Sequence, residues 1–86
     1  MDKREAADLL KELLDTFGSL QGNSFALMPP NADSVLSKGY QIHIKRTLDE
    51  STLLAVRKIV LDRGLAISEE NNLTVIFKPI KNGVAN

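Results

Sequence analysis

Residues 40–46 read Tyr-Gln-Ile-His-Ile-Lys-Arg, and their side chains alternate between apolar and polar. Alternation with a period of two is typical of a strand that buries one face. The apolar side chains of this strand are expected to point toward a core. The polar ones, Gln41, His43 and Lys45, are expected to point the other way.

A helix is predicted directly after this strand. Thr47 and Glu50 have the spacing of a capping box, in which a hydroxyl and a carboxylate satisfy free amides at a helix start. The helix should run from Leu48 to about Arg63, and Gly64 suits the left-handed backbone that ends a helix. Its apolar side chains are Leu53, Leu54, Val56, Ile59, Val60 and Leu61. They occupy most of the circumference, so we expect one flank on the sheet and another on the first helix or a partner chain.

The residues that follow give the clearest hairpin pattern in the chain. A two-residue turn would pair Ile67 with Ile76 and leave Val75 and Phe77 on the other face. A three-residue turn would instead place Val75 and Phe77 on the same apolar face as Ile67. The three-residue turn is favoured here because it collects more apolar side chains on one face.

The N-terminal part of the chain is predicted to contain a helix and a weaker strand. Apolar residues recur in the helix at spacings of three and four. Pro29 and Pro30 end the strand because proline cannot donate to a ladder. In chain order, the expected elements are helix 3–17, strand 24–28, strand 40–46, helix 48–63, strand 65–69 and strand 73–79.

This order, α-β-β-α-β-β, predicts a two-layer α+β sandwich with a small mixed sheet and the helices on one face. The two strands joined through the second helix are expected to be parallel neighbours in a right-handed crossover, with the last strand antiparallel to one of them. A single domain should span residues 1–81, with 82–86 as a frayed tail. A chain of 86 residues buries only about 60% of its unfolded surface, which allows one modest core.

The composition argues against most catalytic chemistry. The chain has no cysteine, which excludes disulfides, zinc–thiolate sites, iron–sulfur clusters and a thiol nucleophile. The single histidine, His43, has Gln41 and Lys45 as strand neighbours, and neither orients an imidazole as a carboxylate would. No phosphate-binding glycine loop or nucleophile elbow is present. We therefore expect no enzymatic activity, no cofactor, no metal and no small-molecule ligand.

No targeting segment is apparent either. The N-terminal residues mix charges and lead into no apolar run of signal-peptide length. No strictly apolar stretch is longer than residues 53–56, which are far too short for a membrane span. These features predict a cytoplasmic protein with no membrane partner.

The formal charge of zero conceals two unequal halves. Residues 1–37 hold three basic and six acidic side chains, and residues 38–86 hold eight and five. The first helix carries an acidic stripe, consisting of Glu5, Asp8, Glu12 and Asp15. The basic half suits an anionic partner, but attraction between two halves of one domain needs no partner. We favour the second interpretation because duplex-binding domains are usually basic overall.

The sheet face away from the helices is the first candidate binding surface, together with two cations of the second helix. The candidate residues are Gln41, His43, Lys45, Arg57, Lys58, Ile76 and Lys78. Lysines on such a face can bind RNA or single-stranded DNA phosphates, but binding platforms usually add aromatic side chains that stack on bases. Tyr40 and Phe77 are both expected on the core side, so a solvated sheet face is the favoured interpretation.

Arg57 lies among apolar side chains on the helical wheel. Two interpretations are equally open: its stem covers the core edge with the guanidinium in water, or it reaches a carboxylate on the first helix or on a second copy. The apolar surplus of its helix, with Ile76 and Ile80 outside the expected core face, predicts a non-catalytic module that binds a protein partner or itself. The alternative is a small nucleic-acid-binding domain that uses the open sheet face, or the second helix and hairpin as a winged helix.

Overall fold

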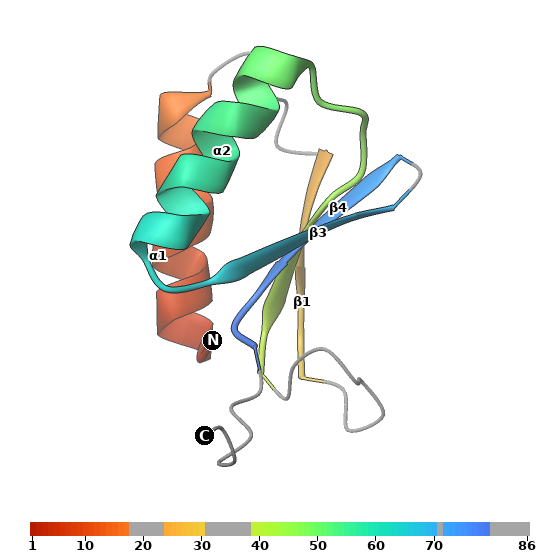
Figure 1. Cartoon of the computed structure of the whole chain (residues 1–86). Helices are drawn as coiled ribbons and strands as arrows, with labels where there is room; N and C mark the ends of the chain where they lie inside the picture. Colours follow the sequence, from red (N-terminus) through yellow and green to blue (C-terminus); the bar gives the residue numbers. More distant parts are fainter. Residues whose placement is uncertain (18–23, 31–38, 71, 80–86) are drawn as a thin grey trace, which may run out of the picture.

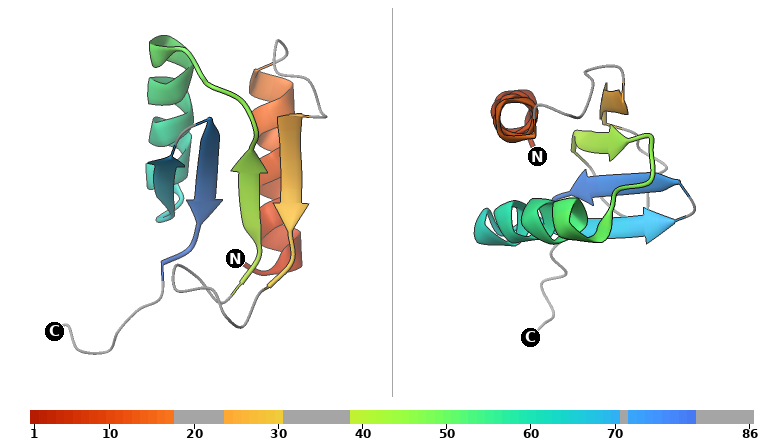
Figure 2. Two further views of the ribbon diagram at one scale, coloured as in Figure 1. Left: turned by 90° about the vertical axis from the view of Figure 1, so that its right-hand side faces the viewer. Right: turned by 90° about the horizontal axis from the view of Figure 1, so that it is seen from above.

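The structure, a computed structural model, describes residues 1–17, 24–30, 39–70 and 72–79. Its elements are α1 (Lys3–Thr16), β1 (Phe25–Met28), β2 (Gln41–Ile44), α2 (Glu50–Asp62), β3 (Ala66–Glu70) and β4 (Leu73–Phe77). The predicted order and two-layer α+β architecture are confirmed, and both helices lie on one face of the sheet (Figure 1, Figure 2). The predicted tail at 82–86 lies outside the described residues, as does Ile80.

The sheet has the order β1-β2-β4-β3, and every neighbouring pair is antiparallel. The prediction of a mixed sheet with β2 and β3 as parallel neighbours is therefore wrong. β4 lies between them, so β2 and β3 run in the same direction without pairing. In this position Ile76 of β4 pairs with Ile42 on one side and Ile67 on the other, which brings three isoleucines together beneath the helices.

The β3–β4 hairpin has the register of the two-residue turn, because Glu70 pairs with Leu73. The preference for a three-residue turn was wrong. Side chains directly opposite each other share a face of the sheet, so Ile76 faces the helices while Val75 and Phe77 face away. Counting apolar residues failed here because β4 carries them on both faces.

The core lies between the sheet and the two helices. Its fully buried members include Leu9 and Leu13 of α1, Val56 and Val60 of α2, and the isoleucines of β2 and β4. α1 packs over β1 and β2, and α2 packs over β3 (Figure 2). Tyr40 is half-buried and packs against this core, on the side where the alternation of residues 40–46 predicted it.

α2 begins two residues later than the sequence suggested. Asp49 is its N-cap, and the carboxylate accepts a hydrogen bond from the Thr52 amide at 2.7 Å. The predicted capping box of Thr47 and Glu50 is therefore not formed, and that prediction is wrong. An Asp carboxylate is a strong cap acceptor, and capping at Asp49 leaves Leu48 in contact with the core. The Thr47 hydroxyl instead donates to the side chain of Asn72 in the β3–β4 turn, at 2.6 Å.

Two glycines are required by the backbone. Gly64 follows α2 with a φ of 72°, the left-handed conformation predicted for it. Gly39 lies against the N-terminal residue, where an added Cβ would come within 2.4 Å of the Met1 carbonyl oxygen. The same carbonyl accepts a hydrogen bond from the Tyr40 amide at 2.7 Å, and the Met1 side chain is buried in the core.

One ion pair joins the acidic and basic halves of the chain. Arg63, the C-cap of α2, pairs with Glu12 on α1. Glu12 belongs to the acidic stripe predicted on the first helix. This contact supports the interpretation that part of the charge asymmetry is matched inside the domain.

Candidate interaction surface

The open sheet face is the side of the sheet that none of the described helices covers (Figure 2). Strand register places six central side chains on it, namely Gln41, His43, Ala66, Ser68, Val75 and Phe77. The face is more apolar than predicted because the hairpin register turned Val75 and Phe77 toward it. Phe77 is only 8% exposed, so its ring offers little surface for a base to stack on.

Gln41 and His43 lie together on this face, as their alternation predicted. The imidazole Nε2 is 3.0 Å from the Gln41 Oε1, which is the partner oxygen if Nε2 carries the proton. Partial burial lowers the pKa of His43, and the positive charge of Lys45 lowers it further. Both effects favour the neutral imidazole.

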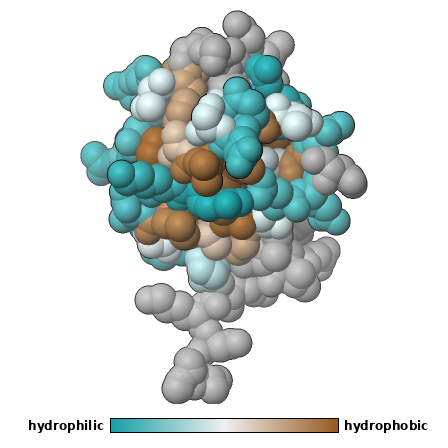
Figure 3. Space-filling model, turned by 45° about the horizontal axis from the view of Figure 1, so that its top comes forward, coloured by the Kyte–Doolittle hydropathy of each residue, from teal (hydrophilic) through white to brown (hydrophobic). Residues whose placement is uncertain are grey.

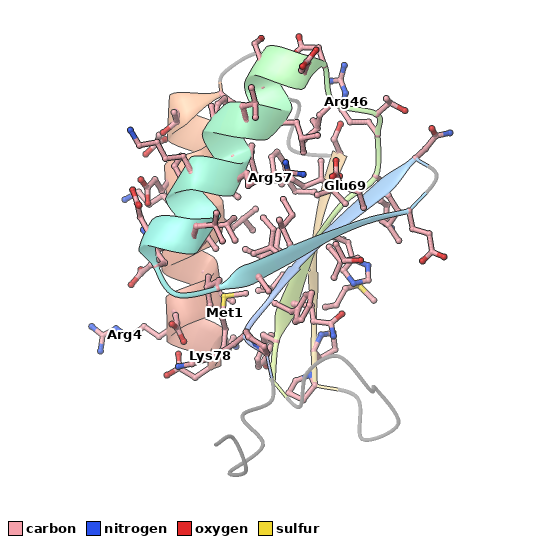
Figure 4. The ribbon with its side chains drawn as sticks, viewed as in Figure 1. Met1, Arg4, Arg46, Arg57, Glu69 and Lys78 are labelled. Atoms are coloured by element: carbon pink, nitrogen blue, oxygen red, sulfur yellow. The ribbon has the colours of Figure 1, made fainter. Side chains whose placement is uncertain are left out.

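The other candidate residues do not join this pair. Ile76 is fully buried in the core, so its predicted place on the binding surface is wrong. Lys58 is exposed on α2, on the helix side of the sheet. Lys78 follows β4 and lies below Arg57 in Figure 4, close to Met1. The basic residues of the second half that the structure describes are therefore spread over several surfaces and do not form one patch.

Arg57 reaches a carboxylate that the sequence did not single out. Its Nη2 atom is 2.6 Å from the Glu69 Oε1 on β3, and each of the two side chains is 40% exposed (Figure 4). The first helix, one of the two sources predicted for such a carboxylate, does not supply it within the chain. The turn length of the hairpin could have predicted this contact, because a two-residue turn places Glu69 on the helix side of the sheet with Ile67.

Two leucines of α2 are exposed beside this ion pair. Leu54 and Leu61 are 56% and 59% exposed. They stand three residues before and four residues after Arg57, so all three share one flank of the helix. Arg57 on this flank contacts β3, whereas Arg63 near the other flank contacts α1. The leucines therefore lie on the flank of α2 that is turned away from α1.

β3 lies directly below this flank and is the last strand of the sheet. Its outer edge pairs with no other described strand, so backbone donors and acceptors remain available there. We call the combination of Leu54, Arg57 and Leu61 with the outer edge of Ala66–Glu70 the α2–β3 surface. It joins exposed apolar groups to an unpaired strand, the two elements from which sheet-extending interfaces are built.

Apolar side chains on the face shown in Figure 3 are interrupted by hydrophilic ones. The exposed large apolar side chains of the α2–β3 surface are Leu54 and Leu61 alone, and broad apolar contact by itself would not define a partner. The unpaired edge of β3 adds backbone hydrogen bonds, which fix the direction of the partner strand.

Other kinds of site find less support in the part of the chain that the structure describes. No three His, Asp or Glu side chains there converge as metal ligands. Neither α1 nor α2 combines the length and apolar character that a membrane span requires.

Comparison with known proteins gives no relative: no family model, no curated protein and no solved structure matches the chain.

Proposed function

We propose that this chain is a non-catalytic protein-interaction module that binds its partner through the α2–β3 surface. The observation that carries this proposal is the position of two exposed leucines, Leu54 and Leu61, on the helix flank above an unpaired edge strand. A partner that covers both features buries apolar area and completes backbone hydrogen bonds at the same time.

The energetic contribution of the leucines is sufficient to matter. Full burial of a leucine side chain contributes about 1.5–3 kcal/mol relative to full exposure, and each of these leucines is already partly covered. Burying the remainder of both therefore contributes on the order of 2 kcal/mol, or more than tenfold in affinity. Hydrogen bonds along β3 would fix the orientation of the partner.

Nucleic-acid binding has weaker support. The candidate cations face different directions, and the α2–β3 surface carries the acidic Glu69 and Glu70. Arg57 is engaged with Glu69 and is not free to neutralise a phosphate without losing that pair. The open sheet face offers Lys45 near His43, but its aromatic ring, Phe77, is nearly covered.

Site-specific photo-crosslinking tests the proposal. A photoreactive amino acid at position 54 should form adducts with protein in the cells that make the chain. The same probe at Ala7, which is exposed on α1, should form few. Leu61→Glu in the probe-bearing chain should reduce the adducts from position 54. Equal adducts from both positions, or none from position 54, would overturn the proposal.

Titration with labelled single-stranded RNA and duplex DNA at two salt concentrations tests the alternative. The interaction module should show no salt-sensitive binding. Binding that weakens steeply with salt would replace the proposal with a nucleic-acid function.

A further inference from the structure

The α2–β3 surface has the pattern of one half of a two-fold interface. Resting on the proposed interaction function, we propose that its occupant is a second copy of this chain, joined through antiparallel pairing of β3 with β3 and centred on Ser68. The two four-stranded sheets would then form one continuous sheet. The two α2 helices would lie side by side on the same face.

The hairpin determines which backbone groups of β3 are free to pair. In a hairpin with a two-residue turn, the residues next to the turn form a hydrogen-bonded pair, and such pairs then alternate along the strand. Glu70, Ser68 and Ala66 therefore direct their backbone groups toward β4. Ile67 and Glu69 direct theirs toward the outer edge, one on each side of Ser68, as a symmetric pairing about that residue requires.

The charges of β3 select this orientation and register. The strand reads Ala-Ile-Ser-Glu-Glu, so its first part is uncharged and its end is acidic. A parallel pairing in register would place acids beside acids. Antiparallel pairing about Ser68 places Glu69 opposite the partner's Ile67 and Glu70 opposite the partner's Ala66, which keeps the like charges diagonal to one another.

The ion pair between Arg57 and Glu69 fits the same axis. Both side chains lie on the helix side of the sheet, and each is 40% exposed. Across the two-fold axis the two Glu69 side chains alternate with the two Arg57 side chains. Each guanidinium then has a carboxylate on either side, and the arrangement is self-complementary.

The positions of Leu54 and Leu61 on α2 fit the same two-fold axis. The midpoint between Leu54 and Leu61 falls beside Arg57, which pairs with Glu69 on β3. A two-fold axis near this point runs the helices antiparallel and brings Leu54 next to the partner's Leu61. The same contact is made twice, as in other isologous interfaces. A single flank of α2 therefore supplies both sides of the apolar contact.

The other edge of the sheet differs. β1 is followed by the exposed Pro29 and Pro30, which have no amide hydrogen to offer a pairing strand. Its edge is also apolar, Phe-Ala-Leu-Met, without the acidic end that favours one register on β3. Self-pairing is therefore assigned to β3.

A single introduced cysteine tests the register, because the natural chain has none. Ser68 would face its own copy in a non-hydrogen-bonded pair with Cα atoms about 4.5 Å apart, within disulfide range. Ser68→Cys should therefore form a disulfide-linked dimer under mild oxidation. Ala66→Cys is the matched control on the same strand and face, because its two copies would be roughly 13 Å apart.

The double variant Ala66→Cys/Glu70→Cys adds a second test, since each residue would lie opposite the other in the partner. It should cross-link efficiently although neither single variant does. Ser68→Cys should cross-link at least about tenfold faster than Ala66→Cys, as expected when only one pair falls within bonding distance. Adding Leu54→Glu should slow the Ser68→Cys reaction, and Ala7→Glu should not. Circular dichroism under reducing conditions confirms that each variant is folded.

Equal cross-linking rates for Ser68→Cys and Ala66→Cys would overturn the self-pairing. If those rates are equal while position 54 still forms adducts with a different protein, the self-pairing fails and the interaction function stands. If position 54 also forms no adducts, both fail.

Discussion

Arg57 on α2 and Glu69 on β3 form an ion pair whose Nη2 and Oε1 atoms are 2.6 Å apart. The pair links α2 to β3, the edge strand that follows it in the chain. It lies on the flank of α2 that is turned away from α1. Leu54 and Leu61 share that flank. The proposed interface is therefore organised around one contact made within a single chain.

A double-mutant cycle with Arg57→Ala and Glu69→Ala should give a coupling energy of about 0.2–1 kcal/mol, since both side chains are well exposed to solvent. The coupling should weaken at high salt. Urea unfolding at low protein concentration measures it. The matched cycle of Arg57→Ala with Glu70→Ala should show no coupling beyond error, and an equal value would mean that Arg57 does not select Glu69.

The hairpin register places neighbouring residues of β4 on opposite faces of the sheet, so their side chains contribute unequally to stability. Ile76→Ala should lower the free energy of unfolding by about 2–5 kcal/mol, because it removes a fully buried side chain from the core. Val75→Ala, on the open sheet face, should cost about 1 kcal/mol or less. Denaturant titration compares the two. A larger loss for Val75→Ala would support the three-residue turn instead.

Gly64→Ala should destabilise the domain by about 1–2 kcal/mol, the cost of left-handed backbone for an ordinary residue. No atom lies within 4 Å of the added Cβ, so the loss reports backbone strain without a steric clash. Gly64→Asn should lose less, because asparagine tolerates this conformation better. Thermal unfolding would contradict this account if Gly64→Ala were as stable as the natural chain.

His43 should make the domain less stable under mildly acidic conditions. Burial, and then the charge of Lys45, holds the pKa of His43 below its usual value in the folded chain. As the pH falls through the usual value, the unfolded chain takes up a proton first. The free energy of unfolding therefore decreases, and this decrease ends below the folded pKa. At a pH above the usual pKa, His43 is neutral in both the folded and the unfolded chain, and this loss of stability is absent.

Comparing the natural chain with His43→Gln between about pH 7.5 and about pH 5.5 isolates this effect, because glutamine does not titrate. The natural chain should lose more stability than the variant over this range. Identical losses would show that the carboxylates account for the whole pH dependence.

Local patterns predicted the elements well. The alternation at residues 40–46 placed Gln41 and His43 on one face, and Gly64 ended the helix as expected. Each of these depends on a few adjacent residues and on the fixed periods of strand and helix. The order of elements, and with it the two-layer architecture, followed directly.

Features that depend on tertiary pairing were not predicted. The position of β4 between β2 and β3 comes from packing Ile76 between Ile42 and Ile67, which no local pattern reveals. The apolar residues on both faces of β4 made the turn length ambiguous. The same error moved Ile76 onto the candidate surface and hid Glu69 as the partner of Arg57.

Hydrogen exchange of the β3 amides tests the central claim most directly. If the α2–β3 surface is the interface between two copies, the amides of Ile67 and Glu69 should exchange more slowly as protein concentration rises from about 10 μM to about 1 mM. The amides of β1, on the opposite edge, should be unaffected. Exchange at Ile67 and Glu69 that stays fast and independent of concentration would contradict the account.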